Sequence, residues 1–185
     1  MKKYLLPLAG LLLACPVVAQ SALVVSQVAE VAPHFLTEMN GAFYFSAYDT
    51  TNGSVLWKSD GTRGGTQVVK SFNISGGTES EPRPQGLLNA GGTLYFCAYE
   101  AATGWELWRS DGTGAGTSMV KDLRSGAENG VEPNACHLAA IGSQVFFPGV
   151  DAVNGAALWK TDGTAANTLM VQDIQPASVW GLPQY

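Results

Sequence analysis

The chain has 185 residues, of which 46% are hydrophobic and 14% charged, and its formal net charge is −5 at pH 7. This composition excludes a disordered chain and supplies enough apolar side chains for a buried core. Because the balance is acidic and no basic cluster occurs, nucleic acid and anionic membranes are not expected as partners.

Residues 1–19 have the layout of a secretory signal peptide. Lys2 and Lys3 precede a short apolar run, and Ala19 offers a cleavage position. The run is too short to cross a bilayer as a mature helix. Segment 20–29 comes next and contains ALVVSQV, which resembles the fourth apolar run of the repeats that begin at residue 30 and predicts an extra strand.

A lipoprotein is the alternative interpretation of the same N-terminus. The sequence LLAC at 12–15 resembles a lipoprotein box, although Pro16 directly after Cys15 is awkward for that processing. We therefore expect a secreted or periplasmic protein, or a lipoprotein at the cell envelope. Contact with a membrane is expected only if Cys15 is lipidated.

From residue 30 onward the chain repeats itself with a spacing of 51 residues between equivalent positions. The most similar part of each copy aligns without gaps in VLWKSDGTRGGTQVV (55–69), ELWRSDGTGAGTSMV (106–120) and ALWKTDGTAANTLMV (157–171). The copies are repeat 1 at 30–80, repeat 2 at 81–131, and repeat 3 with a C-terminal tail at 132–185. A fixed period of this length indicates a repeat architecture built from one supersecondary unit.

Each copy divides at Gly, Asn and Asp into four short apolar runs. In repeat 2 they are GLLNA (86–90), TLYFCAY (93–99), WELWRS (105–110) and TSMVKDL (117–123). Aromatic and β-branched residues at this density, with turn residues every 8–12 positions, predict strands. We expect an all-β fold of three four-stranded antiparallel repeats resembling β-propeller blades. Pro148, within the second run of repeat 3, predicts a bulge or a strand end.

Three blades do not form a closed ring, because propellers usually need four to eight. The sequence is compatible with three arrangements. The chain could be an open partial propeller, half of a six-blade ring formed by a homodimer, or part of a longer repeat assembly.

The recurring motif has a structural explanation in every copy. Its indole can fill the gap between neighbouring sheets. The Asp side chain accepts hydrogen bonds from the turn and the Gly adopts a left-handed conformation. The motif comprises Trp57, Asp60, Gly61, Thr62, Trp108, Asp111, Gly112, Thr113, Trp159, Asp162, Gly163 and Thr164. Calcium bound by the three Asp is the alternative, but the alternating acidic ligands of a calcium loop are missing. No other metal or cofactor is expected.

Repeat 2 resembles a known family most fully. Glu106-Leu107-Trp108 followed by Asp111-Gly112-Thr113 matches the ELWxxDGT repeat of bacterial exported and surface proteins. The other copies have Val55 and Ala157 in place of the Glu. The resemblance covers roughly residues 30–175 and implies an exported, propeller-like β protein. It implies no activity.

Cys97 and Cys136 remain after removal of the signal peptide on the simple secretion route. An oxidising compartment would permit a disulfide between them. The equivalent positions in the other copies hold no cysteine, so a bridge would be a local feature. The sequence leaves bonded and free thiols equally open.

Candidate ligand-binding residues gather around the loop between the second and third strands. No HExxH, CxxC, GxSxG or phosphate-binding loop occurs. Carboxylates recur at equivalent positions after the second strand, and aromatic rings lie beside them, as in surfaces that stack against sugars. The same rings could instead pack between blades, and solvated loop charges explain the carboxylates equally well. These residues are Asp49, Glu100, Asp151, Tyr48, Tyr99 and Trp105.

We therefore expect a non-enzymatic exported binding module at the bacterial surface or in the periplasm, with a glycan as candidate ligand. One alternative is a carbohydrate-active hydrolase, which requires two of the loop carboxylates about 5–10 Å apart. Another is a surface module stabilised by calcium.

Overall fold

The computed structural model describes residues 32–49, 52–72 and 83–173. In this part it contains three four-stranded antiparallel sheets and no helix, so the expected all-β fold is confirmed. Nor does this part hold any helix with the length and apolarity needed to cross a membrane. The expected signal peptide, Cys15 and the expected strand in segment 20–29 lie outside the described residues.

Each sheet falls within one repeat, and we call it a blade. Blade 1 comprises β1 (His34–Met39), β2 (Ala42–Asp49), β3 (Gly53–Ser59) and β4 (Gln67–Ser71). Blade 2 comprises β5 (Gln85–Ala90), β6 (Thr93–Glu100), β7 (Gly104–Ser110) and β8 (Ser118–Met119). Blade 3 comprises β9 (Ala139–Ile141), β10 (Gln144–Asp151), β11 (Gly155–Thr161) and β12 (Leu169–Gln172). In every blade the strands keep chain order across the sheet.

The central hairpin has the same register in all three blades. Each motif Trp pairs with a Phe on the preceding strand, in the pairs Phe45–Trp57, Phe96–Trp108 and Phe147–Trp159. The turn before the second strand is tight, and in blade 1 Asn40 and Gly41 have φ of 54° and 78°. Glycine and asparagine accept this left-handed conformation at low cost.

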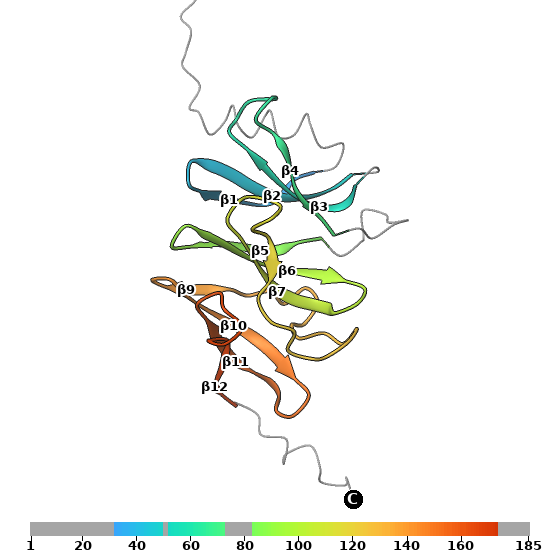
Figure 1. Cartoon of the computed structure of the whole chain (residues 1–185), viewed down its shortest axis with the longest axis vertical. Coiled ribbons are helices and arrows are strands. Elements are labelled where there is room, and N and C mark those ends of the chain that lie inside the picture. Colours follow the sequence, from blue (N-terminus) through green and yellow to red (C-terminus); the bar gives the residue numbers. More distant parts are fainter. Residues whose placement is uncertain (1–31, 50–51, 73–82, 174–185) are drawn as a thin grey trace, which may run out of the picture.

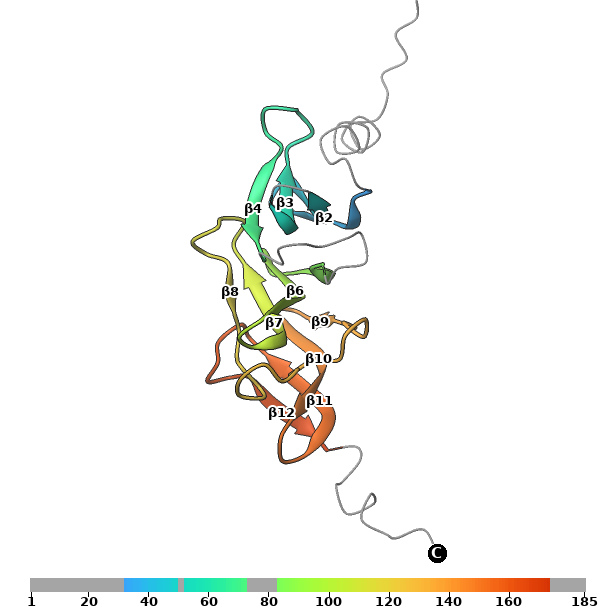
Figure 2. The ribbon, with the colours of Figure 1, turned by 90° about the vertical axis from the view of Figure 1, so that its right-hand side faces the viewer.

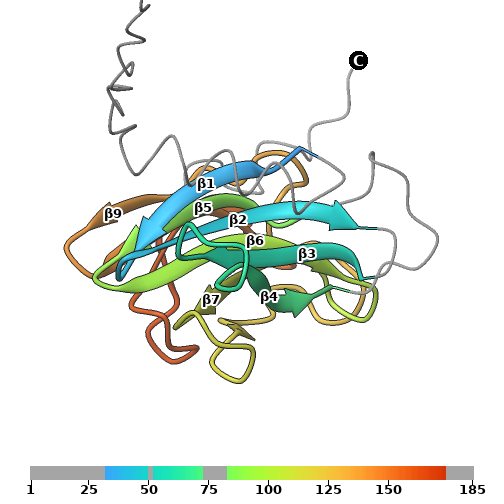
Figure 3. The same cartoon turned by 90° about the horizontal axis from the view of Figure 1, so that it is seen from above.

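The blades are stacked face to face along the long axis of the molecule (Figure 1). Seen along that axis, strands of successive blades overlie one another (Figure 3). A side view places β4 and β8 on one side of the stack and β9 on the other (Figure 2). Side chains also join adjacent first strands, since Asn89 Nδ2 donates to the Glu38 carbonyl at 3.0 Å. This arrangement is a partial propeller.

Each blade has two different faces because side chains alternate along a strand. We call the side that carries the motif Trp the Trp face. The opposite side is the Tyr face, after Tyr44 and Tyr95, whose equivalent in blade 3 is Phe146. Within the chain, the Tyr face of one blade always packs on the Trp face of the next.

The core between blades 1 and 2 shows this packing. Tyr44, Leu56 and Phe72 of blade 1 pack against Phe96 and Trp108 of blade 2, and all five are buried. The Phe72 ring meets the Trp108 indole edge-on, with centroids 5.2 Å apart. Such aromatic contacts add to the area that an indole removes from water.

The second interface repeats the first and carries an additional cross-link. Tyr95 and Leu107 of blade 2 pack against Phe147 and Trp159 of blade 3. Cys97 of β6 is bonded to Cys136, which lies in the segment leading to β9 (S–S 2.06 Å). A disulfide closing a loop of this size typically contributes about 2–4 kcal/mol, and this one ties blade 2 to the chain entering blade 3.

Two local expectations differ from the structure. The fourth run of repeat 2 was expected to extend to residue 123, but β8 ends at Met119 because the chain leaves the sheet after Val120. The expected bulge or strand end at Pro148 is wrong, since β10 runs through it in unbroken register with β11. Because β9 pairs only as far as Phe146, no further strand bond is required of Pro148 on that side.

We predict that Trp108→Ala lowers the free energy of unfolding by about 3–5 kcal/mol, the usual cost of deleting a buried aromatic side chain. Trp57→Ala should cost less, because Trp57 is only half-buried whereas Trp108 is buried. Urea unfolding of both variants in dilute solution measures the two losses. Equal losses would contradict the assignment of Trp108 to an interior interface.

Candidate functional site

The Asp-Gly-Thr turn is bonded within itself in every blade. In blade 2 the Asp111 carboxylate accepts hydrogen bonds from the backbone N–H of Thr113 at 2.8 Å and from its hydroxyl at 2.7 Å. The Thr113 oxygen in turn accepts from the N–H of Gly116. Equivalent bonds recur at Asp60 and Asp162. The motif therefore satisfies its own backbone, as expected for a structural turn.

The turn also contacts the preceding blade, both in blade 2 and in blade 3. The Tyr44 hydroxyl lies so close to Gly112 that a Cβ there would come within 2.1 Å of it. Lys58 Nζ donates to the Gly112 carbonyl at 3.1 Å. Tyr95 lies against Gly163 in the same way, where a Cβ would meet its hydroxyl at 2.5 Å. Glycine is needed here both for positive φ and for close approach.

The hydrogen bonds of the turn also set its electrostatics. The hydroxyl and the N–H of Thr113 hold the pKa of the Asp111 carboxyl below its ordinary value. The pKa of Asp60 and that of Asp162 are lowered by the equivalent Thr residues. A carboxylate that accepts several hydrogen bonds prefers the ionised form, so these turns are most stable when the Asp is charged.

Two of the three loop carboxylates have other interaction partners. Glu100 forms an ion pair with Lys70 of blade 1 at 3.5 Å. Asp151 caps its own turn, accepting hydrogen bonds from the backbone N–H groups of Val153 and Asn154. Asp49 lies at the end of β2. Among the described residues no three His, Cys, Asp or Glu side chains gather as metal ligands would.

The aromatic residues of these loops differ from the expected sugar-stacking surface. Trp105 is 6% exposed and belongs to the core between blades 2 and 3. Tyr48 is also buried, while Tyr99 is half-buried and packs 6.2 Å from the Trp105 ring. At Trp105 and Tyr48 the alternative of packing between blades holds, because strand alternation turns them into the interior.

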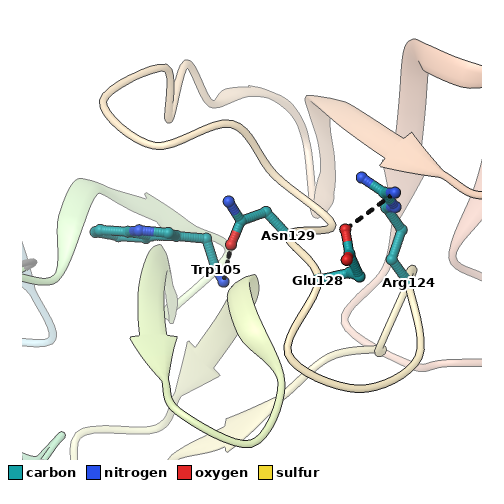
Figure 4. A network of polar contacts seen from close by, with 4 residues as sticks. All are labelled: Trp105, Arg124, Glu128 and Asn129. Carbon is teal, nitrogen blue, oxygen red and sulfur yellow. Dashed lines mark hydrogen bonds and ion pairs between the residues drawn. The ribbon is translucent and has the colours of Figure 1, made fainter.

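A loop at residues 121–131 replaces the end of the fourth strand in blade 2. The N–H of Gly130 and that of Val131 donate to the Trp105 carbonyl at 2.9 and 3.1 Å, resuming the sheet pairing. Asn129 Oδ1 accepts from the Trp105 N–H, and Arg124 pairs with Glu128 at 3.1 Å (Figure 4).

Glu106 lies beneath this loop and was not among the candidate residues. Its side chain is fully buried, and Gly130 packs so closely that a Cβ there would meet Glu106 Oε1 at 2.2 Å. Burial raises the pKa of Glu106 to about 8, although nearby backbone N–H groups of the loop oppose the shift. None of these N–H groups makes a hydrogen bond of ordinary geometry with the carboxylate. In the sequence, the position of this acid within the apolar run WELW was the signal that its side chain could be buried.

The outer face of blade 3 carries an apolar hollow of about 340 Å³. Phe146, Pro148, Ala156 and Leu158 line it from β10 and β11, and His137 also lines it. This is the Tyr face of blade 3, the side without a further blade in the described part of the chain. Aligning the copies would have located it, because the equivalent residues Tyr95 and Leu107 are core residues.

The comparisons leave the family open. No family model matches the chain, and no curated protein matches it. It is similar to Bacteroides ovatus xyloglucan PUL GH43B (TM-score 0.40, 17% identity, 79% of this chain and 29% of that one). It is also similar to an α-L-arabinofuranosidase from Clostridium thermocellum (TM-score 0.37, 15% identity, 75% of this chain and 49% of that one). The chain thus spans less than half of either structure, and these similarities carry no argument about function.

We predict that Asp111→Ala destabilises the fold at pH 7 and that its effect shrinks in acid. Because the folded pKa of Asp111 is lowered, its stabilising contribution is present above the unfolded value and is lost as pH falls. Urea unfolding of wild type and variant at pH 7 and pH 3 tests this. An unchanged difference at the two pH values would contradict a role for the ionised carboxylate.

Glu106 should give the opposite pH dependence. Its pKa rises on folding from 4.5 to about 8, so the fold takes up a proton between these values and loses stability as pH increases. Glu106→Gln keeps the shape without the charge. Relative to wild type, it should gain on the order of 3 kcal/mol between pH 5 and pH 8.

The matched control for this experiment is Glu128→Gln, on the same loop but exposed. Its urea unfolding should track the wild-type pH profile. Parallel profiles for Glu106→Gln and wild type would show that the buried group does not titrate as inferred.

Proposed function

We propose that this chain is an exported, non-enzymatic interaction module that receives a further β-blade on the Tyr face of blade 3. One observation carries the proposal. Several positions that are buried on the Tyr faces of blades 1 and 2 are apolar but exposed or half-exposed on blade 3. Ile141 is 74% exposed, whereas its equivalents Ala90 and Met39 are 4% and 0% exposed.

A second position supports the same conclusion. Val171 of β12 is 44% exposed, while its equivalents Val120 and Val69 are 5% and 8% exposed. These side chains match those that contact a neighbouring blade elsewhere in the chain. An exposed apolar face of this kind marks an interaction site or an aggregation hazard, and its match to two internal interfaces favours a blade as occupant.

The non-enzymatic part of the proposal is supported by the roles of the acidic residues. Glu100 binds Lys70, Asp151 holds its own turn, and Asp60 and its equivalents hold theirs. A hydrolase would need two carboxylates facing one substrate. The N-terminal sequence and the resemblance to the ELWxxDGT family support export. Since Trp105 is buried, a glycan ligand at the strand 2–3 loops is not proposed.

We predict that Leu158→Glu abolishes an apolar binding site on blade 3. An anilinonaphthalene dye, which fluoresces on exposed apolar surface, should bind the wild-type chain diluted until light scattering shows single chains, and bind less to the variant under the same conditions. Val153→Glu is the matched control, because Val153 is 80% exposed in the turn after β10 and lies outside the hollow.

Two outcomes would contradict the proposal. Equal dye fluorescence in wild type and Leu158→Glu would show that the hollow is no binding surface. Release of nitrophenol from chromogenic glycosides by the purified chain, lost in a Glu100→Gln or Asp151→Asn variant, would replace the interaction module by a hydrolase.

A further inference from the structure

We propose that the blade received by blade 3 is blade 1 of a second copy of this chain, so that two copies close a ring of six blades. The inference rests on the proposed function and names its partner. It is drawn from the two interfaces inside the chain, which show what a Tyr face binds, and from the two ends of the stack, which carry the unused halves of that interface.

The internal interfaces use one recurring set of contacts. An aromatic ring on the Tyr face lies under the Gly of the next turn, as Tyr44 does at Gly112 and Tyr95 at Gly163. A basic side chain beside it approaches the same turn. Lys58 donates to the Gly112 carbonyl, and the Arg109 guanidinium lies near Gly163.

The end at blade 3 carries the Tyr-face residues of this set, which we call the receiving half of the interface. Phe146 occupies the ring position, half-exposed in the hollow. Lys160 occupies the basic position equivalent to Lys58 and Arg109. The same blade carries Ile141, Leu158 and Val171, whose equivalents in the other blades are interface residues.

The end at blade 1 carries the Trp-face residues and the turn, which we call the inserting half of the interface. Trp57 is half-buried although its equivalents Trp108 and Trp159 are buried. Leu36 is 47% exposed, whereas Leu87 and Leu138 pack against the cores. Val68, which pairs with Trp57 across the strands, is also exposed. Phe45 and Ala47 of this face are buried, so the contact surface is formed by Trp57, Leu36, Val68 and the turn.

Placing the two ends together completes both halves. Phe146 would lie under Gly61 as Tyr95 lies under Gly163. Lys160 would approach the carbonyl of Gly61 and the carboxylate of Asp60, so the charges are complementary. Because the contact joins two different surfaces, it closes only if the rotations sum to a full turn. Two copies then share two identical interfaces around a twofold axis, and no blade face remains open.

The test measures molar mass by light scattering after size exclusion, on the chain without residues 1–19. Wild type should have twice the chain mass. Ile141→Glu blocks the receiving end and Val68→Glu blocks the inserting end; both sites are exposed, and circular dichroism checks their fold. Each variant alone should be a monomer, and Val153→Glu should remain a dimer.

Mixing the two variants is the decisive step. Each variant retains the end that the other has lost, so a one-to-one mixture should regain a dimer through one interface, with weaker affinity than wild type. Only a contact between different ends predicts this complementation. A contact between two copies of the same face predicts that one variant stays dimeric and that the mixture gains nothing, which would overturn the proposal.

Other results also decide the question. A wild-type monomer at tens of micromolar would overturn pairing with a second copy. If the dye then still distinguishes Leu158→Glu, the interaction face stands and its blade comes from another protein. If the dye shows no difference, the proposed function fails as well. Filaments or larger rings would contradict closure by two copies.

Discussion

The structure depends on one contact, in which the Trp and the Asp-Gly-Thr turn of a blade lie on the aromatic Tyr face of the blade before it. The indole supplies the apolar area and the turn fixes its position. The indole N–H groups of Trp108 and Trp159 have no hydrogen-bond partner in the described part of the chain. Their contribution is therefore packing, assisted by cations: Lys70 lies 4.9 Å from the Trp108 ring centroid and Lys121 lies 5.6 Å from that of Trp159.

This contact has a direction, and the direction shapes the whole molecule. Each blade uses its Trp face backward and its Tyr face forward along the chain. A stack of such blades can bury every interior face but always leaves one face of each kind at its ends. The apolar hollow on blade 3 is thus a consequence of the repeat itself.

Much of this organisation could be predicted from the sequence because the same pattern of residues occurs in three copies. The period placed the strands, and the positions of Trp57, Trp108 and Trp159 indicated where the blades meet. The chemistry of Asp, Gly and Thr also predicted the self-contained turn. The sequence left open whether Trp105 and Tyr48 stack against a ligand or pack between blades, because both lie near a loop in the sequence while their strand positions turn them inward.

The ends of the stack were harder to predict, because exposure of Phe146 or Ile141 depends on whether another element covers blade 3 in space. Single-copy features were harder still. The short β8 and the loop at 121–131 break the period, and no comparison between copies could reveal them. The repeat therefore predicts interfaces well and predicts departures from itself poorly.

The loop at residues 121–131, which breaks the repeat in blade 2, covers a buried acid and also links two blades. Glu106 stands where blade 1 has Val55 and blade 3 has Ala157, and burying an acid there is costly. The loop above it returns to the sheet at Gly130, whose carbonyl accepts from the N–H of Val150 in blade 3. The loop that covers the acid is therefore also a backbone bridge between blades 2 and 3. Together with the Cys97–Cys136 bond, it ties blade 3 to blade 2 at two places, one in the loop after β8 and one in the segment leading to β9.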